Sequence, residues 1–110
     1  MKTQLRKGTL EMCVLAVLAR HDSYVYEIVS TLAQSMDISE GTIYPLMRRL
    51  QGDDWVSTYL VESASGPARK YYRLTPAGGE ALAAMRREWG SFVAEINAVL
   101  GQPRPEGDTP

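Results

Sequence analysis

The sequence predicts a mainly α-helical protein with one small antiparallel hairpin, which places it in the α+β class. Three observations lead to this prediction. Apolar residues recur at three- and four-residue spacing before residue 52. The stretch 55–74 is rich in β-branched and aromatic residues around a Gly-Pro loop. The stretch 76–100 carries a heptad pattern, and the whole chain of 110 residues has the size of one ordinary domain.

Three helices are predicted before the hairpin. The first runs from about 4 to 20 and the second from about 24 to 35, with Asp22 or Ser23 as its cap. The third begins after Ser39 and continues to about residue 51 as one element, although Pro45 is expected to distort its start. The apolar residues that define these helices are Leu10, Cys13, Val14, Val17, Leu18, Ile28, Val29, Leu32, Ile43, Leu46, Met47 and Leu50.

The hairpin and the last helix are predicted from a change in the spacing and type of the apolar residues after residue 52. Strands are expected at 55–61 and 69–74, joined by a loop at 62–68. Thr75 followed by Pro76 predicts the start of a helix that ends near residue 100. The remaining residues, 101–110, have no periodicity and are expected to form a disordered tail.

The last helix carries a seam that one domain of this size cannot cover. About 24 residues span roughly 36 Å at the standard helical rise, so part of the apolar seam needs a partner, and an identical subunit is the simplest one. A homodimer is therefore expected, whereas a seam buried inside one subunit is the alternative. The predicted interface residues are Leu82, Met85, Trp89, Phe92, Val93, Ile96, Val99 and Leu100.

The order of elements is that of a winged helix-turn-helix. We expect a DNA-binding domain at 1–75, a dimerisation helix at 76–100 and the tail at 101–110. A helix that enters the major groove offers its exposed side chains to base edges, and a flanking hairpin offers cations to phosphates. The alternatives are a solvated helix face and an edge strand protected by charge. The predicted DNA-contacting residues are Ser39, Thr42, Tyr44, Arg48, Arg49, Arg69 and Lys70.

The charge distribution favours DNA binding over these two alternatives. Residues 1–75 carry nine basic and eight acidic side chains, and the segment 41–75 carries five and three. Residues 76–110 carry three basic and five acidic side chains. The excess of acidic over basic side chains thus lies in residues 76–110, away from the predicted third helix and hairpin.

Composition argues against several other classes. A single Cys excludes a disulfide framework and a thiolate-cluster zinc site within one chain. With one His, no glycine-rich phosphate loop and no metal-ligand spacing, we expect no enzyme, no catalytic residue, no metal and no cofactor. No apolar run is long enough to cross a bilayer and no signal peptide is evident, so we expect a cytoplasmic protein without a membrane partner.

Four motifs resemble the PadR family of bacterial transcriptional regulators. They are GTLE at 8–11, YVYEI at 24–28, GTIYPLMRRL at 41–50 and GPARKYYRLT at 66–75. The resemblance covers 5–100 and is to the short form of the family, with one C-terminal helix. It implies a dimeric repressor that binds a palindromic promoter element and dimerises through the last helix together with the first. It also implies DNA contacts by Thr42, Tyr44, Arg48, Arg69 and Lys70.

The resemblance to drug-sensing family members implies a second role for Trp89. Trp89 would line a flat apolar pore between subunits, where a planar aromatic or cationic small molecule stacks and releases the DNA. Met85, Glu88, Phe92 and Val93 would complete that pocket. The alternative role of Trp89 is packing within the interface. The alternative function of the chain is a winged-helix adaptor that docks on proteins without binding DNA.

Overall fold

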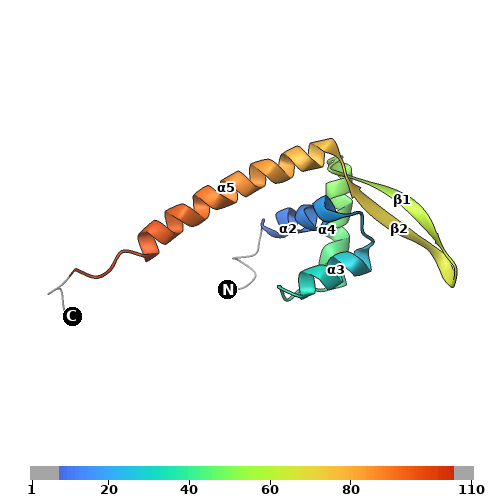
Figure 1. The fold of residues 1–110 in the computed structure, drawn as a ribbon, viewed down its shortest axis with the longest axis horizontal. Coiled ribbons are helices and arrows are strands. Elements are labelled where there is room, and N and C mark those ends of the chain that lie inside the picture. Colours follow the sequence, from blue (N-terminus) through green and yellow to red (C-terminus); the bar gives the residue numbers. More distant parts are fainter. Residues whose placement is uncertain (1–7, 106–110) are drawn as a thin grey trace.

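The computed structural model describes residues 8–105, which form four helices and two strands. This confirms the predicted α+β class. The molecule measures 70 × 26 × 20 Å because the last helix and the hairpin project from opposite ends of the helical body (Figure 1). The elements are α2 (Leu10–Arg20), α3 (Val25–Ala33), α4 (Glu40–Gly52), β1 (Val56–Ser63), β2 (Gly66–Leu74) and α5 (Pro76–Leu100).

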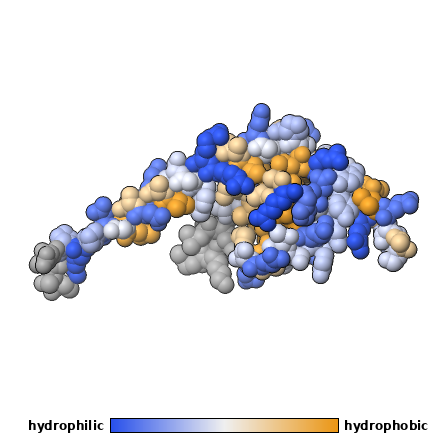
Figure 2. All heavy atoms as spheres, in the orientation of Figure 1, coloured by the Kyte–Doolittle hydropathy of each residue, from blue (hydrophilic) through white to orange (hydrophobic). Residues whose placement is uncertain are grey.

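The core lies where α2, α3 and α4 meet the base of the hairpin and the start of α5. The apolar stripes predicted for the first three helices supply most of it, and apolar atoms gather over this body in Figure 2. Cys13 is half-buried against the core, and burial raises the pKa of its thiol, which agrees with a packing role. The buried apolar residues are Val14, Leu15, Val17, Leu18, Val25, Ile28, Leu32, Ile43, Leu46, Met47, Leu50, Val56, Tyr72 and Leu82.

The predicted start of the first helix is wrong. We expected a helix from about residue 4, but α2 begins at Leu10, and residues 8 and 9 form a turn. Gly8 has a φ of 86°, a left-handed conformation that glycine adopts readily and that interrupts a right-handed helix. Residues 4–7 of the predicted helix lie outside the described residues.

The predicted caps of the second helix are also wrong. The N-cap position of α3 is Tyr24, whose backbone N–H donates to Glu27 Oε1 at 3.3 Å. Ser23 is fully buried and pairs its backbone with Tyr72 of β2 in both directions, at 3.2 and 2.9 Å. Asp22 directs its carboxylate to the hairpin instead. Long-range contacts thus use both residues that local pattern assigned to capping.

Helix α4 continues through Pro45 as one element, as predicted. Ser39 occupies the N-cap position, but its hydroxyl lies 3.3 Å from the Thr42 hydroxyl and bonds to no backbone N–H. The expected distortion at the start of α4 remains a prediction.

The hairpin is longer than expected because the predicted loop at 62–68 is largely paired. Strands β1 and β2 are antiparallel, with Val56 opposite Leu74 and Ser63 opposite Gly66, so that only residues 64 and 65 form the turn. An irregularity in the register lies between Val61 and Ser63. Since each strand of a two-stranded sheet has a free edge, the early Pro67 of β2 is tolerated.

Helix α5 has the predicted bounds and begins with the predicted cap. The Thr75 hydroxyl accepts from the Gly78 N–H at 3.0 Å and donates to the Asp54 carbonyl at 2.6 Å. Beyond its first turns α5 leaves the body, and the radius of gyration of 18.3 Å exceeds the roughly 13 Å of a compact chain of this length. Within residues 8–105, no helix is both long and apolar enough for a transmembrane span.

Candidate nucleic-acid interface

Helix α4 turns one face to the core and a polar face to solvent. Ile43, Met47 and Leu50 are fully buried. Thr42, Tyr44 and Arg48, which neighbour them in the sequence, are exposed, Tyr44 to 47%. Since apolar packing fixes the buried face, the exposed face offers hydroxyls and a guanidinium in one rigid arrangement. Such groups match base edges and phosphates in a major groove.

Arg49 is placed differently from Arg48. Its Nη2 lies 2.6 Å from Glu11 Oε1 of α2, and its Nε donates to the same oxygen at 2.8 Å. Among residues 8–105, Arg48 has no ion-pair partner. Of the two adjacent arginines predicted to contact DNA, Arg48 therefore presents its charge to solvent, while Arg49 links α4 to α2.

The two predicted cations of the hairpin lie on opposite faces. Arg69 pairs with Val61 and Lys70 with Leu60, so successive side chains alternate across the sheet. The Arg69 guanidinium carbon lies 4.8 Å from the ring centre of Tyr24, whereas Lys70 Nζ lies 5.5 Å from that of Tyr72. Both side chains are exposed near the tip of the hairpin.

Three tyrosines and two arginines form a continuous cluster between the hairpin and the start of α3. Tyr59 and Tyr71 stack with ring centres 5.7 Å apart, and Tyr71 meets the Tyr24 ring edge-on at 5.3 Å. Arg73 covers Tyr59 at 4.8 Å, and Arg69 covers Tyr24 at 4.8 Å. We call these five residues the tyrosine–arginine cluster. The exposed Tyr26 stacks on Tyr24 at 6.4 Å.

Asp22 closes the cluster at its other end. The Tyr59 hydroxyl donates to Asp22 Oδ2 at 2.6 Å, and Arg73 Nε lies 3.4 Å from the same oxygen. The hydrogen bond to this carboxylate is the main cause that raises the pKa of Tyr59 above its ordinary value. The Asp22 carboxylate thus holds a neutral phenol and a guanidinium together.

The sequence pattern did not predict this cluster. Arg73 was not among the residues predicted to contact DNA, and Asp22 was predicted only as one of two possible helix caps. One signal was present: Arg69, Tyr71 and Arg73 alternate at a period of two and so share a face of a strand. The partners Asp22 and Tyr24 come from a distant turn, which no local pattern reveals.

The predicted seam of α5 is divided in two. Leu82 is 5% exposed and Met85 is partly buried, so both are covered within their own subunit. From Trp89 onward the seam is largely exposed, and apolar atoms follow the projecting part of α5 in Figure 2. The exposed fractions are 43% for Trp89, 54% for Phe92, 40% for Ile96, 73% for Val99 and 75% for Leu100, and Val93 is half-buried.

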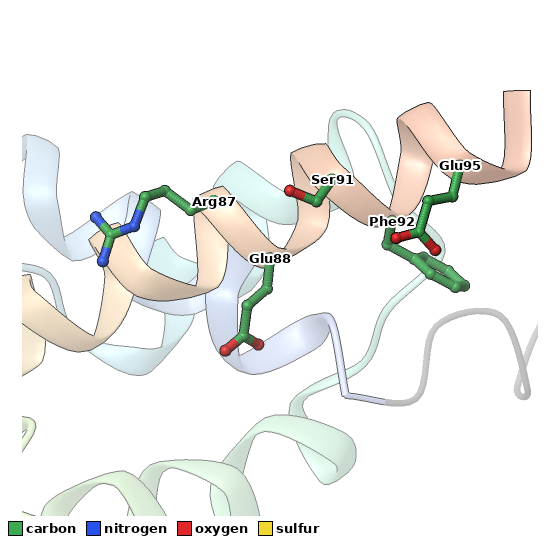
Figure 3. Close-up of a pocket in the computed structure, with 5 residues that line it drawn as sticks. All are labelled: Arg87, Glu88, Ser91, Phe92 and Glu95. Atoms are coloured by element: carbon green, nitrogen blue, oxygen red, sulfur yellow. The ribbon is translucent and has the colours of Figure 1, made fainter. Parts of the chain in front are cut away.

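A shallow surface hollow of about 350 Å³ lies along the same part of α5. Of the residues predicted for an effector pocket, Glu88 and Phe92 line it, and their side chains lie on the same side of α5 in Figure 3. Trp89 packs against Phe92, with ring centres 6.3 Å apart. The other lining residues are Arg87, Ser91 and Glu95.

Comparison with known proteins identifies the family. The sequence model of the transcriptional regulator PadR-like family matches residues 14–84. The chain belongs to this PadR-like family. The match runs from the core of α2 through the hairpin into the first turns of α5, and it includes all of the residues predicted to contact DNA.

Solved structures of PadR-like regulators have the same fold over nearly the whole chain. A regulator from Bacillus cereus is 35% identical, with a TM-score of 0.83, over 91% of this chain and 99% of that chain. One from Eggerthella lenta is also 35% identical, with a TM-score of 0.84, over 94% of this chain and 91% of that chain. A transcriptional regulator of Mycobacterium tuberculosis is 42% identical over 60 residues, 54% of each chain.

The chain is thus a PadR-like, winged-helix, DNA-binding regulator of transcription. The family consists of transcriptional regulators, which are generally not enzymes. Within residues 8–105, no group of three or more His, Cys, Asp or Glu side chains is placed to hold a metal ion.

Proposed function

We propose that this PadR-like regulator is a homodimeric repressor that binds a palindromic operator. In each subunit, α4 enters the major groove, with Thr42, Tyr44 and Arg48 toward the base edges. The hairpin acts as a wing whose Arg69 and Lys70 neutralise phosphates. The observation that carries this proposal is the exposed face of α4, where hydroxyls accompany the Arg48 guanidinium, which has no ion-pair partner among residues 8–105, while the opposite face of the helix is buried.

The exposed part of the α5 seam supports the dimer. Five large apolar side chains from Trp89 to Leu100 are exposed on a helix that projects from the body (Figure 1), and soluble monomers rarely expose a contiguous patch of this kind. A second α5 packed in the same way would cover the patch on both subunits at once. We therefore place the dimer interface from Trp89 onward, since Leu82 is already covered and offers little surface.

Binding to duplex DNA from the region upstream of the gene tests the proposal. Fluorescence anisotropy should show binding that weakens steeply with salt, because counterions are released from neutralised phosphates. Arg48→Ala should reduce the preference for the operator over scrambled DNA, because base contacts specify the sequence. Lys70→Ala should weaken binding to both duplexes about equally. A protein that binds no duplex at low salt would favour the adaptor alternative.

We further propose that a planar aromatic or cationic small molecule releases the DNA. The hollow on α5 combines the Phe92 ring with the carboxylates of Glu88 and Glu95, a pairing that favours an aromatic cation. Proflavine, a planar aromatic cation, should quench the fluorescence of Trp89 in a Trp55→Phe background and lower operator affinity. Glu88→Gln changes a residue that lines the hollow and lies outside the predicted interface, so it should weaken the effect on the operator and retain the dimer. Quenching without any change in operator affinity would contradict regulation.

A further inference from the structure

The carboxylate of Asp22 lies against the hairpin, beside an arginine of the wing. Asp22 occupies the turn between α2 and α3, 37 residues before Tyr59 and 51 before Arg73, yet its Oδ2 contacts both side chains. The side chain of Asp22 is 31% exposed, and that of Arg73 is 59% exposed. Figure 1 shows this turn beside the hairpin. A carboxylate that repels phosphate is unfavourable on a DNA-binding surface unless it does something else there.

The contacts of Asp22 belong to a larger attachment between the turn and the wing. Next to it, the backbone of Ser23 pairs with that of Tyr72 in both directions. On one face of the hairpin, the tyrosine–arginine cluster runs from Arg73 through the stacked rings to Tyr24, the N-cap residue of α3. The turn therefore holds one face of the wing by backbone, by charge and by ring contacts.

This attachment connects the wing to the helices that hold α4. A two-stranded hairpin has little stability of its own, and its direction must come from the elements packed against its base. Helix α3 packs on α4, and the turn before α3 contacts the wing. The turn and α3 therefore link the wing to α4, the two elements proposed to contact DNA. We propose that Asp22 is a positioning residue, whose carboxylate holds Tyr59 and Arg73 and so fixes the wing relative to α4. The consequence for operator recognition rests on the proposed function.

Removing the charge of Asp22 separates positioning from plain electrostatics, because the two effects have opposite signs. Asp22→Asn makes residues 1–75 more positive by one charge, which by itself strengthens binding to any duplex. Loss of the wing position instead weakens binding to the operator, because the wing and α4 no longer reach their sites together. Scrambled DNA requires no such fixed geometry and gains only the electrostatic benefit.

A matched set of variants uses this difference in an anisotropy experiment. Asp22→Asn should lower the ratio of operator to scrambled affinity about tenfold, which is the size of effect caused by one lost base contact. Tyr59→Phe, which keeps the ring and every charge, should lower the ratio in the same direction by a smaller factor. Glu62→Gln is the electrostatic control, since this exposed wing carboxylate has no hydrogen-bond or ion-pair partner among the described residues. It should strengthen binding to both duplexes equally.

Amide hydrogen exchange of the free protein tests the positioning without DNA. In Asp22→Asn, the amides of Ser23 and Tyr72 should exchange faster, while that of Ile28 in the core should be unchanged. The NMR titration of the assigned Tyr59 ring resonances should shift to lower pH in the same variant, because its hydrogen bond to the carboxylate is lost. Unchanged exchange at Ser23 and Tyr72 would overturn the inference, and so would an Asp22→Asn variant that strengthens operator binding as Glu62→Gln does. A wild-type protein without operator preference would overturn the proposed function, and exchange would then decide the inference alone.

Discussion

The first and second halves of α5 have the same apolar pattern but different surroundings. In the first half, Leu82 is almost completely buried, and Gly78 packs directly against the backbone of Trp55. In the second half, the seam from Trp89 to Leu100 is largely exposed in the single chain. A heptad pattern therefore shows that a helix face needs to be covered, but it does not show whether the cover comes from the same chain or from another one.

The two halves should differ most in how the free energy of unfolding responds when a glycine is replaced by alanine. A Cβ at Gly78 would overlap the Trp55 carbonyl oxygen and lie 2.8 Å from Leu74 Cδ1, so the helix or the α4–β1 turn would have to move. Gly78→Ala should lower the free energy of unfolding by about 3 kcal/mol, measured by urea denaturation. Gly79→Ala is the control, because its added Cβ meets only Leu74 Cδ2 at 4.0 Å. Equal stability of the two variants would contradict the close packing of the first half.

A charge in the second half should affect assembly and leave the fold intact. Ile96→Glu should weaken the dimer by at least about 2 kcal/mol, as expected for a central apolar interface residue, and yield monomers by light scattering. The unfolding of the monomer should change little, because Ile96 is already 40% exposed in one chain. Ala94→Glu places the same charge on an exposed position off the seam and should leave the dimer intact. A dimer that persists in Ile96→Glu would place the interface elsewhere.

The start of the first half can be tested at its cap. Thr75→Ala removes the hydroxyl that accepts from the Gly78 N–H and donates to the Asp54 carbonyl. The free energy of unfolding should fall by about 1 kcal/mol, the usual effect of losing an N-cap. Thermal unfolding measures it, and Thr75→Ser should retain most of the stability because the hydroxyl is kept. A Thr75→Ser variant as unstable as Thr75→Ala would show that the methyl group matters instead.

The smallest expected effect is a gain of stability in the second half. None of the described atoms outside the helix lies within 4 Å of a Cβ added at Gly90. Gly90→Ala should therefore stabilise the helix by about 0.5–1 kcal/mol through lower backbone entropy in the unfolded chain. Thermal unfolding should show a higher midpoint. A lower midpoint would mean that another chain approaches this backbone closely, which would extend the interface beyond the seam.

Local pattern was sufficient for the order of elements and for the buried faces. Helix α5 has the predicted bounds, and the recurring apolar residues of α4 are the ones that the core buries. The errors occur where long-range pairing competes with a local signal. Ser and Gly residues in 62–68 are typical of a loop, but cross-strand pairing extends both strands through them. Ser23 is of a residue type that often caps helices, but its backbone pairs with that of Tyr72.

Local pattern also predicted which residues of the candidate nucleic-acid interface are exposed on α4, but not how they are paired. The exposed residues of α4 follow from helical periodicity, because once one face is buried the other faces outward. Arg48 and Arg49 cannot be distinguished by this argument, since both are adjacent polar residues on the exposed side. Only the position of Glu11 on a separate helix gives Arg49 an ion pair and leaves Arg48 open to solvent.

The sequence by itself determined the class of fold, the motifs of a PadR-like regulator and the presence of an unusually long amphipathic helix. These features depend on residue type and spacing along one segment, which the printed sequence contains. The tertiary structure alone decided which half of α5 is covered, which arginine is paired and how Asp22 holds the wing. Each of these depends on side chains brought together from segments far apart in the chain, and no local spacing encodes such a meeting.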